Sequence, residues 1–152
     1  KLFIIRELQG KLRRQNTMNI DLFVNEFAKK LKSDDFFKNI KIVKPFANAS
    51  YSGQIKQNVV ALYLGSTEFS PCEIGDNTKS GEASIRADIY VPHINADFAK
   101  TIFYNICRVS GDYDIVSIKS YKCEYSKYAK AVVLKSEFTF KTNFEFGGES
   151  SG

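Results

Sequence analysis

The chain contains a single histidine, His93, and no tryptophan. Protein zinc sites and Ser-His-Asp triads both rely on histidine, and no cysteine or carboxylate lies at a ligand spacing from this one. The internal glycines are isolated, and none forms the G-x-G-x-x-G or G-K-[ST] pattern that cradles phosphate groups. We therefore expect no metal site and no cofactor, and we predict that His93 is an exposed loop residue.

Cysteine is also scarce, with Cys72, Cys107 and Cys123 scattered along the chain and no C-x-x-C spacing. Three unclustered cysteines fit a reducing compartment better than a disulfide framework, although a bridge within one pair stays open. We predict that Cys107 and Cys123 are small buried apolar groups. A nucleophilic Cys72 would need a base and a lowered pKa, and the sequence indicates neither. The paired carboxylates Asp34 and Asp35 are explained by turn formation, so we predict no catalytic residue and no enzyme.

Long apolar runs are absent as well, so we expect neither a membrane span nor a secretory signal. What the chain does have is 43% apolar residues within 152, enough for one ordinary domain with a core. Residues 1–17 hold five cations against one acid, and Met18 is the sole methionine. We therefore interpret residues 1–17 as a basic leader, residues 18–146 as a single domain and residues 147–152 as a flexible tail. The leader is either translated from an over-extended reading frame or a genuine N-terminal helix.

The clearest local pattern is a strand that runs through a proline into a helix. Up to Pro92, apolar residues on one face alternate with polar ones on the other, among them Arg86 and Asp88, which is the period of a half-buried strand. Asn95 can then cap a helix with one apolar face, and Gly111 closes it. The residues that carry the pattern are Ala83, Ile85, Ala87, Ile89 and Val91 in the strand, and Phe98, Ile102, Phe103, Ile106 and Val109 in the helix.

The rest of the chain predicts a second helix and further strands. A helix is indicated from Asn19 by the spacing of Ile20, Phe23, Val24, Phe27 and Leu31. Extended segments are predicted at Phe36–Lys44 on a sheet edge, at Asn58–Gly65, at Ile115–Tyr125 and at 132–141. Within Ile115–Tyr125 the apolar positions change phase, which predicts a bulge or two-sided burial near Ser120. The fold class is thus α+β, with a mostly antiparallel four- to five-stranded sheet, two flanking helices and the order α-β-β-β-α-β-β. Two polar excursions, Phe46–Gln57 and Ser66–Gly81, are long for passive connections and are expected to be arms that contact something.

Lysines and tyrosines interleave between Lys119 and Lys135. Five lysines and three tyrosines stand against one acid, Glu124, on an expected hairpin. Bases of nucleic acids stack on aromatic rings in basic grooves, so this hairpin is a candidate nucleic-acid surface. Lysines also guard exposed strand edges against aggregation, and the segment has no arginine, the usual base-reading cation. A small nucleic-acid-binding or adaptor module that uses the hairpin 119–135 is therefore the alternative interpretation.

The run EASIRADIYVPHINADFAKTIFYNICRV at residues 82–109, followed by the basic hairpin, resembles the tail terminator proteins of tailed phages and of phage-tail-like bacteriocins. Those proteins begin with a helix and insert a second helix after a strand that ends in a similar Y-x-P turn. The resemblance implies a homo-oligomeric ring, typically of six subunits, that sits on the last ring of the tail tube. Such a ring stops tube growth and joins the tube to the sheath end or the head connector.

The resemblance also implies the partners and the place of action. The partners would be further copies of the chain, the tail tube protein, and a sheath or head-tail connector protein, without a membrane or a specific nucleic acid. The protein would belong to a virion or a phage-tail-like particle assembled in the bacterial cytoplasm. We expect subunit contacts at Phe46–Gln57, Ser66–Gly81 and the hairpin Tyr125–Lys130, because these segments are polar and protruding.

Overall fold

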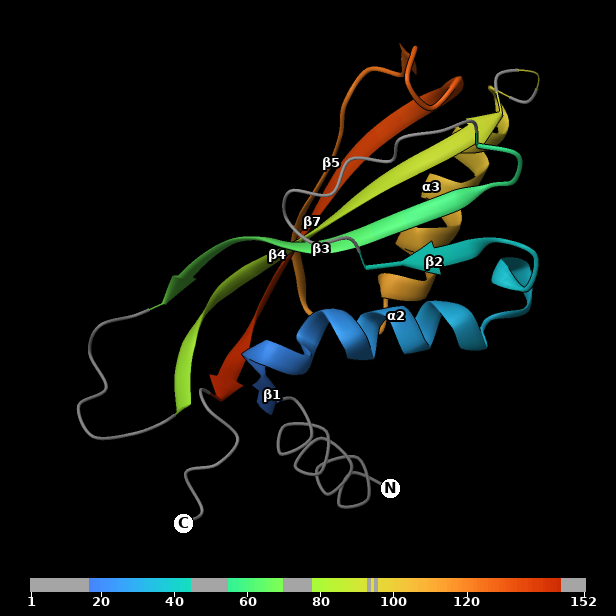
Figure 1. The fold of residues 1–152 in the computed structure, drawn as a ribbon. Coiled ribbons are helices and arrows are strands. Elements are labelled where there is room, and N and C mark those ends of the chain that lie inside the picture. Colours follow the sequence, from blue (N-terminus) through green and yellow to red (C-terminus); the bar gives the residue numbers. More distant parts are fainter. Residues whose placement is uncertain (1–16, 45–54, 70–77, 93, 95, 146–152) are drawn as a thin grey trace.

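The computed structural model describes residues 17–44, 55–69, 78–92, 94 and 96–145, which form one sheet and two α-helices (Figure 1). The α+β class, the two flanking helices and the predicted element order are confirmed. Two strands of three residues, β1 and β6, add to the predicted sheet. The elements are β1 (Thr17–Asn19), a 3-10 turn (Ile20–Leu22), α2 (Phe23–Ser33), a 3-10 turn (Asp35–Phe37), β2 (Lys41–Val43), β3 (Val59–Phe69), β4 (Thr78–Pro92), α3 (Phe98–Ser110), β5 (Ile115–Ser120), β6 (Glu124–Ser126) and β7 (Ala131–Glu145).

The centre of the sheet is the antiparallel pair β4 and β7. Their register runs without a break from Thr78 opposite Glu145 to Pro92 opposite Ala131. On the far side of β4 lie β3, antiparallel, and then β2, which pairs parallel with β3 at the edge. On the far side of β7 lie β5 and β6, both antiparallel, and β1, parallel. The predicted edge position of the segment before Pro45 is confirmed by β2.

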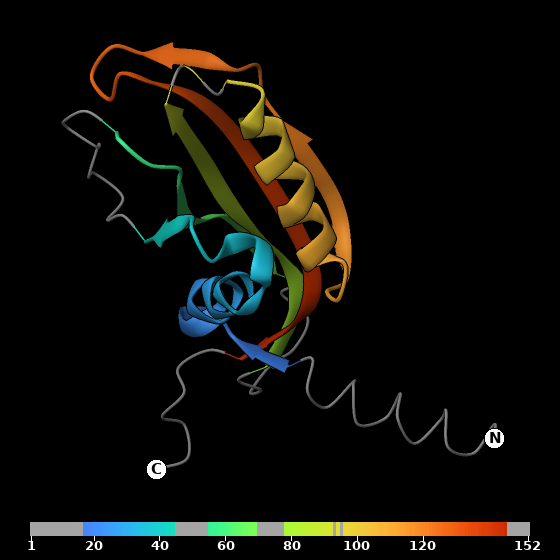
Figure 2. The same cartoon turned by 90° about the vertical axis from the view of Figure 1, so that its right-hand side faces the viewer.

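Both helices cover the same face of the sheet, as the two orthogonal views show (Figures 1 and 2). The predicted alternation in β4 turns its apolar side chains toward them, and each of these side chains is fully buried. From α2, Phe23 and Phe27 pack against Tyr113 and against Phe140 of β7. From α3, Ile102 and Ile106 join the same core. We call this side of the sheet the helix face and the opposite side the open face.

The helix ends predicted from the sequence are confirmed only in part. Gly111 stands at the C-cap of α3, as predicted, and its N–H donates to the carbonyl of Arg108. Asp97 occupies the N-cap position without a side-chain cap bond, and Asn95, the predicted cap, lies outside the described residues. At α2 a 3-10 turn follows Asn19, and the N-cap is Leu22.

The second predicted excursion, Ser66–Gly81, is largely sheet where it is described. Strand β3 continues to Phe69 and β4 begins at Thr78, and Phe69 lies opposite Gly81. The register shifts between Leu64 and Thr67, where the buried Ser84 hydroxyl accepts a 2.8 Å hydrogen bond from the Ser66 N–H. Backbone pairing thus extends the hairpin through polar residues whose composition predicts a loop. A Cβ atom at Gly81 would collide with the backbone of Glu68 and Phe69, so glycine permits this close approach.

The strand predicted over Ile115–Tyr125 is divided in two. The register shifts between Ile115 and Ser117, and β5 ends at Ser120. It shifts by one residue again between Ser120, which lies opposite Ser136, and Glu124, which lies opposite Val133, so the irregularity predicted near Ser120 is confirmed. The Tyr121 N–H still donates to the Lys135 carbonyl, at 2.9 Å. The chain then leaves β7 at Cys123, which packs against the core, and pairs with it again as β6. The extra residue after Ser120 explains why the apolar positions change phase there, from Val116 and Ile118 to Tyr121, Cys123 and Tyr125.

Candidate interaction surfaces

Within the described residues, no group of three or more histidine, cysteine, aspartate or glutamate side chains is placed to hold a metal ion. His93 and Cys72 lie outside those residues. Cys107 and Cys123 are free and half-buried against the core, less enclosed than predicted. Burial raises the pKa of the Cys107 thiol, which keeps it protonated and unreactive at neutral pH.

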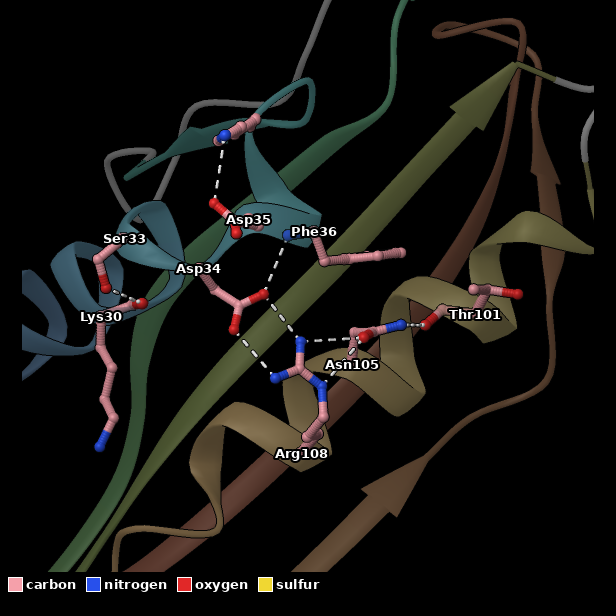
Figure 3. Close-up of polar contacts among 9 residues, drawn as sticks. Lys30, Ser33, Asp34, Asp35, Phe36, Thr101, Asn105 and Arg108 are labelled. Carbon is pink, nitrogen blue, oxygen red and sulfur yellow. Dashed lines mark hydrogen bonds and ion pairs between the residues drawn. The ribbon is translucent and has the colours of Figure 1, made fainter.

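The carboxylate of Asp34 links the end of α2 to α3 (Figure 3). Its two oxygens accept hydrogen bonds from the Arg108 guanidinium at 2.8 and 2.9 Å, and one oxygen also accepts from the Phe36 N–H at 3.0 Å. The bond from Arg108 is the main cause that lowers the pKa of Asp34. The predicted turn role of Asp34 is confirmed, and the sequence does not reveal its partner in α3.

A second ion pair lies one turn away along α2. The Lys30 ammonium is 2.7 Å from the Asp112 carboxylate and 4.6 Å from the centre of the Tyr113 ring. Lys30 lowers the pKa of Asp112 through this contact. The two ion pairs thus connect α2 and the residue that follows it with α3 and the residues that follow α3.

The open face carries a polar cluster at its centre. Arg86 of β4 lies between two aromatic rings, 5.9 Å from the centre of Tyr63 and 5.9 Å from that of Tyr121. The Tyr63 hydroxyl donates a 3.2 Å hydrogen bond to Asp88, two residues along the same strand as Arg86. Burial is the main cause that raises the pKa of both Asp88 and Tyr63. In the part of the chain that the structure describes, Arg86 Nε and Asp88 Oδ1 are buried and have no hydrogen-bond partner.

A hollow of about 280 Å³ lies beside this cluster. Its lining combines cations with one acid and one apolar side chain: Arg86, Tyr121, Lys122, Glu124, Val133 and Lys135. The alternation of apolar and polar residues in the sequence places Arg86 and Asp88 on the polar side of β4. It cannot show that β3 and the segment after β5 bring tyrosines onto them, because those pairings are set by the register of strands distant in sequence.

The predicted basic hairpin is exposed along one edge of the sheet. All five of its lysines are exposed, as are Tyr121, Tyr125 and Tyr128, which is 85% accessible. Lys130 at the turn has a φ of 50°, a left-handed conformation that is uncommon for a side-chain-bearing residue. A second hollow of about 370 Å³ separates this edge from α3, and its lining includes Lys100, Tyr104, Tyr121 and Lys122.

The first predicted arm, Phe46–Gln57, is described only from Ile55 onward. The Ile55 N–H donates to the Ala129 carbonyl at 2.9 Å, and both side chains are buried in a small cluster with Val59 and Ala131. The end of this arm and the basic hairpin are therefore joined. No helix of the described residues is long and apolar enough to cross a membrane.

No protein-family model matches the chain, and no curated protein matches it. Among solved structures, a chain in the "Virion of native gene transfer agent (GTA) particle" is similar to this chain with a TM-score of 0.47. The two chains are 9% identical over the aligned part, which covers 77% of this chain and 91% of the other. Similarity at this level establishes neither a shared family nor a shared function.

Proposed function

We propose that this protein is a structural assembly protein of a phage-type tail that acts as a tail terminator. Copies of the chain form a ring, typically of six, that caps the tail tube, stops its polymerisation and joins it to the sheath end or head connector. No catalytic step, cofactor or membrane belongs to this function. The protein acts in a virion or phage-tail-like particle assembled in the bacterial cytoplasm.

The observation that carries the proposal is that both helices cover one face of the sheet. Both lie on the helix face, and in the described part of the chain the open face has no helix and is covered at one end by the small cluster of Ile55, Val59, Ala129 and Ala131. The sheet also ends at β2 on one side and at β1, β5 and β6 on the other, with no further described strand beyond them. A subunit with two unlike edges can make head-to-tail contacts, which close into a ring when the rotation between copies permits.

The apolar side chains at the β5 edge support the same function. Val116 and Ile118 are 50% and 40% exposed on this strand. An exposed, partly apolar edge strand is an open site for pairing with another chain, and soluble proteins usually protect such edges. Apolar and aromatic groups at interfaces supply binding energy without any reactive pocket.

Deletion of the gene from its native genome, followed by electron microscopy of the particles, tests the proposal. We expect tubes of irregular and excess length without the protein, and regular tubes when the wild-type gene is restored. The double variant V116K/I118K should fail to restore them, because charges on both side chains block edge pairing. The matched variant T101K adds a charge at an exposed position on α3 and should restore them. Regular tubes in the deletion strain would overturn the proposal.

The purified double variant must also be folded for this comparison to be valid. Both side chains are partly exposed, so we expect the substitutions to lower the free energy of unfolding by about 1 kcal/mol or less. Circular dichroism during urea unfolding measures that loss. If a folded double variant restores tube length, the β5 edge is not the subunit contact, whereas the deletion result still decides the capping function.

A further inference from the structure

Residues 119–135 form a basic segment at one edge of the sheet. They contain five lysines and one acid, whereas the other described residues together contain twelve cations and twelve acids. Residues 29–44 are as basic, with six lysines and two acids, but three of those lysines form ion pairs with carboxylates: Lys29, Lys30 and Lys38. A field that is concentrated on one edge attracts a partner of opposite charge to that edge.

The lysines of this segment are not neutralised within the fold. Elsewhere Lys29, Lys30, Lys38 and Arg108 each form an ion pair with a carboxylate. None of Lys119, Lys122, Lys127, Lys130 and Lys135 forms an ion pair with any described residue, and all five are exposed. The ammonium groups of Lys119, Lys122, Lys127 and Lys130 are thus available to a ligand without the loss of an ion pair. Lys135 lies opposite Asp88 and acts electrostatically on its carboxylate.

Exposed aromatic rings accompany these charges. Tyr121, Tyr125 and Tyr128 are 46%, 56% and 85% exposed and stand on the same segment as the lysines. Across the hollow of about 370 Å³, α3 adds Lys100 and the 64% exposed Tyr104. Aromatic rings beside a basic track are the arrangement on which unpaired bases stack while lysines contact the phosphates.

We propose that this edge, residues 119–135 with Lys100 and Tyr104, binds the backbone and unpaired bases of a single-stranded nucleic acid without reading its sequence. The absence of arginine from the hairpin fits this mode, because arginine is the residue that reads base edges bidentately. An acidic protein would contact the lysines, but its binding would not require the exposed tyrosine rings. The binding does not require the capping function, and it is a property of the free chain, because a neighbouring copy paired with β5 in the proposed ring would cover Lys119.

Fluorescence anisotropy of a labelled oligothymidylate of about 20 nucleotides with the full chain tests the proposal. Release of counterions by five lysines predicts that affinity falls about 100-fold between roughly 50 and 200 mM salt. The triple variant K122Q/K127Q/K130Q should weaken binding at low salt by at least tenfold. The triple variant K32Q/K41Q/K56Q removes the same charge from exposed positions elsewhere and should weaken it by less than about threefold.

The tyrosines separate nucleic acid from an acidic protein as the ligand. Tyr128→Ala should weaken binding about fivefold or more, whereas Tyr128→Phe, which keeps the ring, should bind as the wild type does. The absence of binding at low salt, or equal loss in the two lysine variants, would overturn the proposal. Equal competition by poly-glutamate together with an unaffected Tyr128→Ala variant would also overturn it, and would identify an acidic protein surface instead.

Discussion

Asp88 lies on the open face in surroundings that disfavour the charged form of its carboxylate. Asp88 is 8% exposed, and its Oδ1 has no hydrogen-bond partner among the described residues. Burial raises the pKa of Asp88, while the Tyr63 hydrogen bond, Lys135 and Arg86 act in the opposite direction. Because burial is the largest cause, the folded protein holds the Asp88 proton more tightly than the unfolded chain does.

The raised pKa of Asp88 predicts the effect of Asp88→Asn on stability. Between the ordinary aspartate pKa and the raised one, the native state binds more protons, so wild-type stability increases as the pH falls through that window. Asparagine still accepts from Tyr63 and carries no charge. We expect the variant to gain about 1 kcal/mol of unfolding free energy at pH 7 and to lose this pH dependence.

Urea unfolding at a series of pH values, with Asp114→Asn as an exposed control, measures both effects. A variant that is less stable than the wild type at pH 7, with an unchanged pH dependence, would show instead that Asp88 is a stabilising ion. At the residue scale, the sequence predicts that Asp88 points away from the core. It does not predict that Asp88 is enclosed, because Tyr63 comes from β3 and the neighbouring Lys135 from β7.

The elements that the sequence predicts well are those with a strong local period. In β4 and α3 the apolar side chains that the pattern predicts to face the core do pack in it, so pattern and structure agree over Ala83–Val91 and Phe98–Val109. The pattern is misleading where backbone pairing acts without apolar burial, as at Ser66–Phe69 and Thr78–Gly81. It is also incomplete at β1, whose three residues pair with β7 from the other end of the chain.

The packing of α2 on the sheet rests on Phe27. Its ring is fully buried and lies 5.7 to 6.4 Å, between ring centres, from the rings of Tyr113, Phe138 and Phe140. Phe27→Ala should lower the free energy of unfolding by about 3–5 kcal/mol, since it removes a large buried side chain and leaves a cavity. Phe27→Leu keeps most of the volume and should cost roughly 1–1.5 kcal/mol, which remains measurable if the alanine variant does not fold.

Urea unfolding of both variants beside Lys29→Ala, an exposed change on the same helix, provides the measurement. A loss below about 1 kcal/mol for the alanine variant would mean that α2 contributes little to the core. The same helix carries Asp34 at its C-terminal end, and its bond to Arg108 depends on how α2 and α3 sit on one sheet face. No local sequence pattern contains that information, which is why this ion pair is absent from the sequence prediction.

Over the whole molecule, stability should decrease from the centre of the sheet to its edges. β4 is paired on both sides and its inward side chains are fully buried, whereas β5 is paired only with β7 among the described strands. Backbone amides exchange with solvent through local opening, which is rarest where pairing and burial are greatest. We expect the slowest hydrogen exchange at Ile85–Ile89 of β4 and much faster exchange in β5 and β6.

The expected difference in exchange rate between β4 and β5 makes it possible to locate the subunit contact in the proposed ring. Hydrogen exchange followed by mass spectrometry is compared for the protein alone and for capped tubes isolated from particles. If β5 pairs with a neighbouring copy, its amides become protected in the assembled state, while those of β4 are already protected and change little. Protection that appears on the α2 surface and leaves β5 unchanged would place the contact on the helix face instead. The comparison of exchange rates needs no substitution, because it uses the same chain in two states. In this it differs from the measurement of tube length in a variant.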